Sequence, residues 1–252
     1  MARPAPSPTV VADCASCPHL ARHEATRCAP NVVCVQDTRP SVLERFFRAN
    51  RDLADLSLTE DRPELRAAAA RYASIFRLPA LMADEDGDVR AVLAERLPGR
   101  HVLKLRHDPD SRVRVMAAGR LAGAELAPMI SDSDYFVRLV VARRLPPDVL
   151  PVLMCDGEAE VRREVARRIP AEWLMAMVWD DEPRVRLEVA ARLDGCQLAV
   201  FLKDRDWRVR HAVAQRIDPG FLSHLAEDDD DDVREVAQHR LAGSTKEEGG
   251  ES

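Results

Sequence analysis

Four cysteines close together near the start of the sequence are the residues whose chemistry is easiest to anticipate. Cys14, Cys17, Cys28 and Cys34 follow the spacing C-x2-C-x10-C-x5-C, which places four thiols within 21 residues. That stretch is compact enough to surround a single metal centre. Four thiolates suit either a tetrahedral zinc ion or a [4Fe–4S] cluster. The spacing therefore predicts a metal site and leaves these two metals open.

Other readings of this segment have less support. No strand–helix–strand pattern surrounds Cys14 and Cys17, so a thioredoxin-type dithiol is not expected. The C-x2-C-x2-C-x3-C-P run of bacterial ferredoxins is absent. His19 and His23 could replace a thiolate in a zinc site, but we interpret them as surface or capping residues.

Composition and charge restrict the class of protein. Hydrophobic residues make up 46% of the 252 residues, charged residues 32% and aromatic residues only 4%, which favours helices. No apolar run approaches the roughly 20 residues of a membrane span, and the N-terminus lacks an apolar signal core. We therefore expect a cytoplasmic protein, in which clustered cysteines indicate metal before disulfides. The net charge of −6 gives no basic footprint, so a nucleic-acid partner is not expected.

The sequence after the cysteine segment follows a strict 24-residue period. A Val-Arg pair recurs seven times without insertion, always five residues after an Asp and seven residues before an Arg. Repeats of this kind indicate a solenoid. The Val positions are Val89, Val113, Val137, Val161, Val185, Val209 and Val233. The Asp positions are Asp84, Asp108, Asp132, Asp156, Asp180, Asp204 and Asp228. An eighth, degenerate unit begins at Leu65–Arg66.

Each repeat divides into two halves. The first half carries apolar residues at helical spacing, such as Val89, Leu93 and Leu97, and predicts a helix of about three turns. Asp108 followed by Pro109 predicts an N-cap and a first helical residue. Prolines after the closing Leu or Ile stop the helix; they are Pro98, Pro146 and Pro170.

The second half carries a Leu-x-x-Leu pattern in about ten residues. Pro128 and Pro151 interrupt it, so it suits a tight turn of 3-10 helix. Since a helix of 12 residues is marginal in water, each repeat needs its neighbours to cover its apolar stripe. Cys155 and Cys196 lie at variable positions of this half and are interpreted as incidental thiols.

The recurring Arg and Asp residues could form a ladder that binds anions. We interpret them instead as architecture, because they recur in all seven repeats. An Arg at a helix end can bond free carbonyls there, and an Asp can do the converse at a helix start. Their charged ends would then lie at the seam between repeats. The acidic run Glu227–Asp232 has no calcium-binding spacing and is interpreted as a solvated helix start.

Three segments follow from these patterns. Residues 1–62 form a four-cysteine module, in which Ser41–Leu58 has a helical pattern that packs the module onto the first repeat. Residues 63–243 form the helical solenoid of seven full repeats and one degenerate repeat. Residues 244–252 are polar and are predicted to form a disordered tail.

A four-cysteine preface followed by units of the form D-x4-V-R-x5-R-L resembles the leucine-rich repeat variant iron–sulfur proteins of nitrogen-fixing bacteria. The resemblance extends over essentially residues 10–242. It implies a [4Fe–4S] cluster on Cys14, Cys17, Cys28 and Cys34, with zinc as the alternative that the residues left open. It also implies an all-α fold, a right-handed superhelical solenoid of alternating α and 3-10 helices behind a small N-terminal iron–sulfur domain.

Three functions are compatible with this organisation. The first is a scaffold whose extended face binds a protein partner, with Tyr135, Trp173, Trp179 and Trp207 as candidate anchors. The second is a redox role, as an electron carrier or a sensor of oxygen. The third is a nucleic-acid-binding solenoid, which the net charge disfavours. No catalytic triad or phosphate-binding loop is present in the sequence, so an enzyme is not expected.

Overall fold

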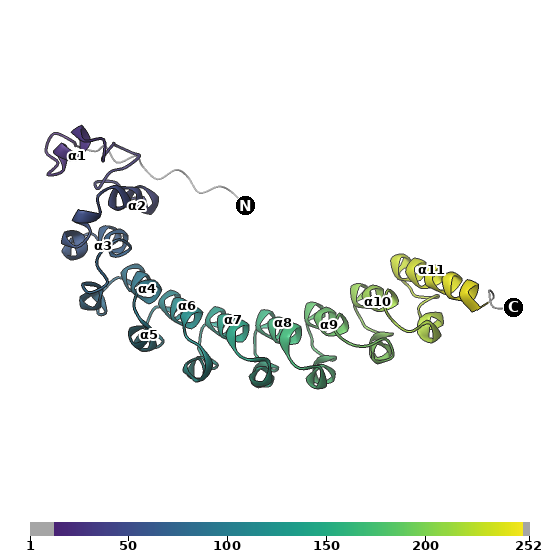
Figure 1. Ribbon diagram of the computed structural model, residues 1–252. Coiled ribbons are helices and arrows are strands. Elements are labelled where there is room, and N and C mark those ends of the chain that lie inside the picture. The colour runs from purple at the N-terminus through teal and green to yellow at the C-terminus, as the bar shows by residue number, and fades with distance from the viewer. Residues whose placement is uncertain (1–12, 249–252) are drawn as a thin grey trace. The chain divides into compact units, whose positions relative to one another are not determined.

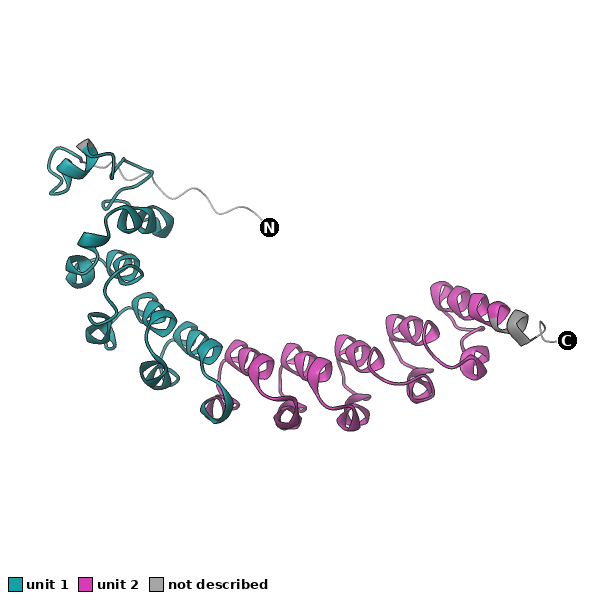
Figure 2. Ribbon diagram, viewed as in Figure 1, with its two compact units in different colours: residues 1–125 teal, residues 126–252 magenta. Residues whose placement is uncertain are grey.

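The computed structural model describes residues 13–248 of the chain; residues 1–12 and 249–252 lie outside the described part. The chain divides into two compact units, residues 1–125 and residues 126–252 (Figure 2). The described residues form helices and one isolated bridge between Ala29 and Val33, with no strand among them. Within residues 13–248, no helix combines the length and the apolar character that crossing a membrane requires.

Unit 1 contains the cysteine segment, a linking segment and the first repeats. Its α-helices are α1 (Leu20–Glu24), α2 (Pro40–Ala49), α3 (Pro63–Ala70), α4 (Gly87–Arg96), α5 (Gly99–Leu105) and α6 (Ser111–Arg120). Its 3-10 helices are η1 (Arg51–Leu53), η2 (Leu56–Thr59), η3 (Leu78–Leu81) and η4 (Gly123–Glu125). The linking segment has the predicted helical character, although Leu56 within it is 73% exposed.

Unit 2 contains only repeats. Its α-helices are α7 (Tyr135–Arg144), α8 (Ala159–Arg168), α9 (Pro183–Ala190), α10 (Trp207–Ala214) and α11 (Asp231–Glu248). Its 3-10 helices are η5 (Ala127–Met129), η6 (Pro147–Leu153), η7 (Ala171–Met177), η8 (Gln197–Phe201) and η9 (Pro219–His224). Within each unit the α-helices of the repeats form one layer, and the 3-10 helices, together with α5 in unit 1, form a second (Figure 1). The predicted alternation is thus confirmed, except that α5 is an α-helix where a 3-10 turn was expected.

The core lies between these two layers and follows the repeat. The Val of each Val-Arg pair is completely buried in all seven repeats. The following apolar positions of the helix are also buried, as in Leu93 and Leu97 of α4. The second layer contributes its Leu-x-x-Leu residues, such as Leu150 and Leu153 of η6. Because each repeat is too short to enclose a core alone, this burial makes every repeat depend on its neighbours.

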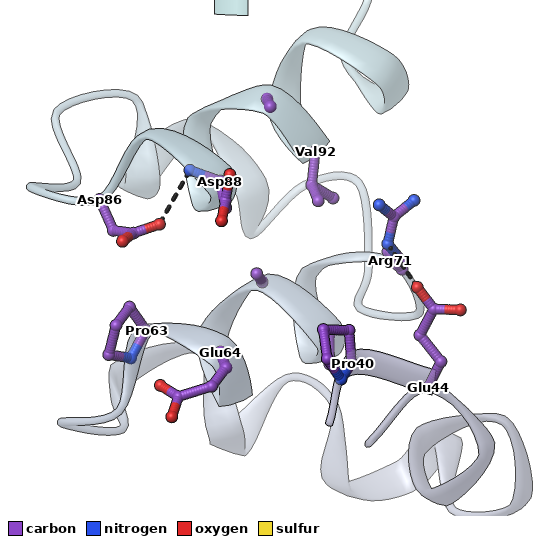
Figure 3. A pocket seen from close by; sticks show the side chains of 11 residues that line it. Pro40, Glu44, Pro63, Glu64, Arg71, Asp86, Asp88 and Val92 are labelled. Carbon is purple, nitrogen blue, oxygen red and sulfur yellow. Dashed lines mark hydrogen bonds and ion pairs between the residues drawn. The ribbon is translucent and has the colours of Figure 1, made fainter. Parts of the chain in front are cut away.

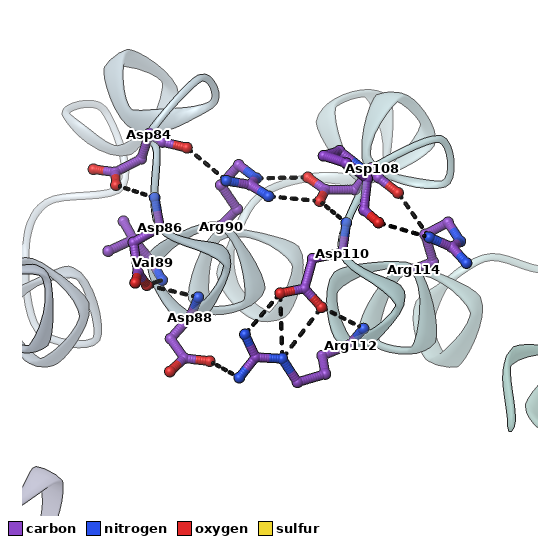
Figure 4. Close-up of polar contacts among 10 residues, drawn as sticks. Asp84, Asp86, Asp88, Val89, Arg90, Asp108, Asp110, Arg112 and Arg114 are labelled. Carbon is purple, nitrogen blue, oxygen red and sulfur yellow. Dashed lines mark hydrogen bonds and ion pairs between the residues drawn. The ribbon is translucent and has the colours of Figure 1, made fainter. Parts of the chain in front are cut away.

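The helices begin two residues later than the sequence predicts. Asp108 is not the N-cap of α6; Asp110 is, and its carboxylate accepts from the backbone N–H of Arg112 at 2.8 Å. The carboxylate of Asp108 accepts from the backbone N–H of Asp110 at 2.9 Å and is otherwise taken up by Arg90 (Figure 4). The predicted N-cap is wrong because a residue of the preceding repeat already occupies that carboxylate.

A ladder of ion pairs joins consecutive repeats. Six arginines of the repeats, Arg66 of the degenerate repeat and the Arg of five Val-Arg pairs, each reach the Asp that lies 18 residues further along the chain. Two parallel N–H groups donate to the two carboxylate oxygens at 2.6–2.9 Å. Bidentate pairs of this kind fix geometry as well as charge. The rungs are Arg66–Asp84 and Arg90–Asp108 in unit 1, and Arg138–Asp156, Arg162–Asp180, Arg186–Asp204 and Arg210–Asp228 in unit 2. The architectural interpretation of these residues is therefore supported.

The Arg at the end of each helix makes a second connection. Arg120 donates to the carbonyls of Ala94 at 2.9 Å and Leu97 at 2.6 Å, which belong to the end of the preceding helix α4. Arg240 does the same to Ala214 and Ile217 at the end of α10. The sequence predicts that such an Arg bonds free carbonyls, and the structure shows that they belong to the neighbouring repeat. Unpaired carbonyls at one helix end are thus satisfied by the next repeat.

The ladder makes stability depend on pH in the acid range. Burial raises the pKa of Asp84, Asp156 and Asp180, but hydrogen bonds from their arginines and from a backbone N–H outweigh it, so each pKa lies below its ordinary value. For Asp228 the hydrogen bonds from Arg210 are the largest cause of the lowered pKa. A carboxylate whose pKa is lowered by folding stabilises the folded state at pH values above its unfolded-state pKa of about 3.9. This stabilisation is lost as the pH falls through the folded-state pKa.

We therefore expect the free energy of unfolding to decrease as pH falls below about 4, and an Arg210→Met variant to show a shallower decrease. Urea unfolding measured between neutral and acid pH tests this. Arg205→Met is the matched control, because the contacts of Arg205 with Asp181, an ion pair at 3.6 Å and a hydrogen bond to the backbone carbonyl, are exposed. Equal acid slopes for Arg210→Met and the parent chain would contradict the role of the ladder.

The C-terminal region differs from the sequence-based prediction in one respect. The helix α11 continues through Ser244 to Glu248, where the sequence predicts a disordered tail. Lys and Glu are good helix formers, so they extend a helix that has already begun. The acidic run has the predicted role, since Asp228 pairs with Arg210 and Asp230 accepts from the backbone N–H groups of Asp232 and Val233.

Candidate metal centre

A short turn presents the first two cysteines. The backbone N–H of Cys17 donates to the carbonyl of Cys14 at 3.4 Å. Asp13 holds this turn, since its carboxylate accepts from the backbone N–H of Ala15 at 3.1 Å and from the Ser16 hydroxyl at 2.6 Å. The hydrogen bond from the Ser16 side chain lowers the pKa of Asp13. Cys14 and Cys17 are both partly exposed, so the turn lies at the surface of the module.

A narrow loop brings the other two cysteines together. Ala29 and Val33 pair as an antiparallel bridge, with N–H to carbonyl distances of 2.7 and 2.9 Å, and they directly flank the loop between Cys28 and Cys34. Asn31 at its tip has a φ of 62°, a left-handed conformation that asparagine adopts more readily than most residues. Cys28 and Cys34 are buried. The loop thus places two thiols side by side in the interior.

The linking helix holds this loop in place. Asn50, at the end of α2, donates from its side-chain amide to the carbonyl of Arg27 at 2.9 Å, immediately before Cys28. Arg45 of α2 donates to the carbonyl of Val32 at 2.7 Å. Gln36 donates to the carbonyl of Asp13 at 3.0 Å and thereby ties the second cysteine loop to the first turn. The cysteine spacing gives no signal for these supporting residues.

The linking segment also joins the module to the first repeat, as predicted. Phe46 and Phe47 are completely buried, and the ring of His19 lies 5.7 Å from that of Phe46. Arg62 donates to the carbonyls of Val35 and Asp37. The ion pair between Arg71 of α3 and Glu44 of α2, at 3.0 Å, crosses the predicted boundary between residues 62 and 63.

The electrostatics of Cys28 show that the four thiols lie close together. Burial, then the charges of Cys34, Cys17 and Cys14, and a hydrogen bond with Cys34 together raise the pKa of Cys28 to about 11. A thiol with so high a pKa is a weak nucleophile at neutral pH. A bound metal reverses this, because a coordinating thiol is deprotonated outright. The donor set therefore fits a cationic, thiophilic centre such as iron or zinc.

The assembly of the site is partial. Among residues 13–248, no three His, Cys, Asp or Glu side chains are already arranged as a group that could hold a metal ion. His23 is committed elsewhere, since its Nδ1 lies 2.9 Å from the carbonyl oxygen of Cys28. Cys155 and Cys196 are exposed thiols of unit 2. The thiols of Cys14, Cys17 and Cys34 lie within electrostatic range of Cys28 but are not arranged as a metal-binding group, and the role of the four cysteines as ligands stays a prediction.

Comparison with known proteins defines the class to which this centre belongs. A family model described as "LRV protein FeS4 cluster" matches residues 10–56, the segment that contains all four cysteines of the module. The cofactor that this family indicates is an iron–sulfur cluster. A module of this kind attached to helical repeats makes the chain an iron–sulfur-binding repeat protein.

Two relatives specify the family. A solved structure described as a leucine-rich repeat variant with a novel repetitive protein structural motif is similar to this chain with a TM-score of 0.84 and 38% sequence identity. The similarity covers 91% of this chain and 99% of that one. An uncharacterized 27.7 kDa protein in the nifB 3′ region of Rhodobacter capsulatus is 43% identical over 89 residues. That match spans 35% of this chain and 36% of the relative.

The chain therefore belongs to the leucine-rich repeat variant family, as its cysteine preface and its 24-residue period predict. The predicted fold class, an all-α repeat solenoid with an N-terminal iron–sulfur domain, is confirmed.

Proposed function

We propose that the chain is a scaffold that carries a [4Fe–4S] cluster on Cys14, Cys17, Cys28 and Cys34 and binds a protein partner through the exposed side chains of unit 2. It acts by binding and not as an enzyme. When bound, such a cluster supplies a cross-link between its ligands and a site for one-electron transfer. The residues of the chain position the thiols, since Asp13, Asn50 and Gln36 hold the loops that present them. A cytoplasmic location stays a prediction.

The observation that carries this proposal is the exposure of large apolar side chains in unit 2. All four aromatic residues named from the sequence are exposed by more than two fifths of their surface. Apolar neighbours on the short helices are exposed as well. This set comprises Tyr135, Phe136, Val149, Val152, Trp173, Met175, Trp179 and Trp207. Since the ladder and the core already use the conserved positions of the repeat, these variable positions are available for binding.

Trp179 is the best candidate for an anchor. It is 77% exposed and borders two surface cavities, of about 400 and 250 Å³. Met154 and Met177 contribute to the larger cavity, whereas Lys203 and Arg205 line the smaller one. A largely exposed tryptophan beside two hollows that are lined by both apolar and charged side chains is typical of the residues that dominate the energy of protein interfaces.

Replacing Trp179 by alanine is expected to weaken partner binding by about tenfold and to change the free energy of unfolding by less than about 0.5 kcal/mol. Capture of binding proteins from an extract of the native host, followed by titration of the captured protein, measures the first effect. Phe76→Ala is the matched control, because Phe76 is a 90% exposed aromatic residue of unit 1. Undiminished binding by Trp179→Ala and by alanine variants of the other exposed aromatics would refute the proposal.

A redox role is the second candidate, and the partial exposure of Cys14 and Cys17 favours it. A cluster with two exposed ligands would be accessible to an electron donor or to oxygen. A reversible one-electron signal from the anaerobically purified protein would support this role. Destruction of the cluster on reduction would leave it with a structural role.

A further inference from the structure

A groove crosses the α-helical layer of unit 1, over α2, α3 and α4 (Figure 3). Its volume is about 420 Å³, within the range of sites that bind ligands or partner side chains. Its floor consists of apolar residues of all three helices; they are Pro40, Pro63, Ala67, Ala68, Ala91 and Val92. Every lining residue belongs to unit 1, and none belongs to the cysteine loops.

Small residues at two repeat positions open this groove. Ala67 and Ala91 occupy the repeat position that carries Val115, Leu139, Arg163 and Leu187 in the following helices. Ala68 stands where the next five helices of this layer have the larger Val92, Met116, Val140, Glu164 and Glu188, and only α10 again has an alanine there, Ala212. Deletion of these side chains from one helix face leaves a trough between neighbouring helices. A cavity at the corresponding positions between α8 and α9 is lined by Arg163, Arg184, Leu187 and Glu188, so it is the alanine floor and the acidic rim that distinguish the groove of the first repeats.

The rim of the groove is acidic. Glu44, Glu64, Asp86 and Asp88 line it together with a single cation, Arg71. Glu64 on the α3 side faces Asp86 and Asp88 at the start of α4 (Figure 3). An apolar trough with four carboxylates and one guanidinium around it complements a side chain that is aliphatic along its length and cationic at its end.

Two of the four rim carboxylates, Glu44 and Asp88, have close cationic partners. Arg71 forms ion pairs with Glu44 at 3.0 Å and with Glu95 at 2.7 Å. Asp88 pairs with Arg112 at 2.5 Å. Glu64 is held more weakly, because the distance of its ion pair with Arg62 is 3.8 Å and both side chains are about one third exposed.

We propose that this groove binds a lysine-bearing segment of a protein partner, with the methylene groups of the lysine on the alanine and proline floor and its ammonium group beside Glu64. Lysine fits this chemistry because it can lay its alkyl stem on an apolar surface while its charged end stays at a polar rim. The inference rests on the proposed scaffold function, since it names the chemistry of a partner, but it concerns a surface other than the exposed aromatics of unit 2.

Fluorescence anisotropy with the intact, cluster-loaded chain tests the groove. The probe is a fluorescein-labelled peptide of five Lys-Ala repeats. Ala91→Leu, which fills the trough, and Glu64→Gln, which removes the ammonium partner, are each expected to weaken binding by about tenfold. Ala91→Leu is expected to fold, because Leu139 and Leu187 already occupy the same repeat position.

Two variants serve as matched controls. Glu160→Gln alters the same repeat position as Glu64, in α8 of unit 2, and Ala212→Leu enlarges an alanine of α10 at the repeat position of Val92. Both are expected to bind the peptide as the parent chain does. Equal losses in the controls and in the groove variants would show only a general attraction to a chain of net charge −6 and would overturn the proposal.

Two further outcomes separate the alternatives. Displacement of the peptide by spermidine at concentrations equal to or below that of the peptide would assign the groove to a free polyamine and overturn its assignment to a protein partner. Unchanged peptide binding by Ala91→Leu and Glu64→Gln, with partner capture still dependent on Trp179, would refute the groove alone. If these variants lose peptide binding while Trp179→Ala captures the partner as the parent chain does, only the role of the exposed aromatic residues would be refuted.

Discussion

Replacing Arg186 by methionine is expected to lower the free energy of unfolding by about 3–5 kcal/mol. Arg186 and Asp204 form a rung of the ladder with two N–H to oxygen distances of 2.7 Å, and their side chains are only 4% and 5% exposed. Methionine keeps the apolar stem but leaves the carboxylate of Asp204 buried without its cation. It also removes the donors to the carbonyls of Asp180 and Asp181.

Urea unfolding followed by circular dichroism measures this loss. Arg208→Met provides a close control, because Arg208 pairs with Asp206 at 2.6 Å while 52% of its side chain is exposed. Exposed pairs contribute below about 1 kcal/mol. Adding Asp204→Leu to Arg186→Met removes the unpaired charge and is expected to restore part of the stability. If Arg186→Met cost no more than Arg208→Met, the ladder would not be what holds neighbouring repeats together.

Replacing Cys28 by serine is expected to abolish cluster binding. The protein purified without oxygen should contain about four iron atoms and four acid-labile sulfide ions per chain. Cys28 is buried, and its thiol lies within electrostatic range of the other three, so a serine there removes a ligand that no neighbouring side chain can replace. We expect the same loss for Cys14→Ser.

Metal analysis of the matched thiol variants completes this experiment. Cys155→Ser and Cys196→Ser alter exposed thiols of unit 2 and are expected to retain all iron and sulfide. One zinc ion per chain without sulfide would contradict the iron–sulfur assignment and would also remove the redox role. Full retention of iron by Cys28→Ser would show that the ligand set is wrong.

The sequence could predict the repeated elements because their causes are local. Apolar residues at helical spacing and prolines after Leu97, Leu145 and Ile169 are enough to place the α-helices and their ends. The short helices were predicted from Pro151 and the short apolar spacing. Gly99–Leu105 lacks an internal proline, which permits an α-helix there but does not require one, since the proline-free Ala171–Met177 is a 3-10 helix.

Contacts between repeats were beyond the reach of these local patterns. The sequence shows that Arg90 and Asp108 are separated by a constant interval in every repeat, but it also shows Asp84 at a constant interval before Arg90. Only the stacking of helices decides that the Arg90 guanidinium binds the carboxylate of Asp108 and the carbonyl of Asp84. The N-cap was misassigned for this reason.

The candidate sites differ in the same way. The spacing of the cysteines identifies the metal module, whereas Gln36 and Asn50, which hold its loops, bind backbone carbonyls 23 residues away in the sequence. The alanines of the groove are visible in the repeat register. Glu44 of α2 lines the same groove as these alanines. This arrangement depends on how the linking helix packs, which the repeat period does not predict.

The ladder also determines how the length of this chain can change. Each rung joins residues 18 apart, and each carbonyl contact joins residues 26 or 23 apart, so the loss or duplication of one whole repeat leaves both intervals intact. Removing residues 163–186 would bring Asp204 to Arg162 and the carbonyl of Ala142 to Arg192, which reproduces contacts that the parent chain already makes. A deletion of any shorter length would misalign them. Members of this family should therefore vary in size by multiples of 24 residues, a step set by electrostatic register and not by tolerance of loops.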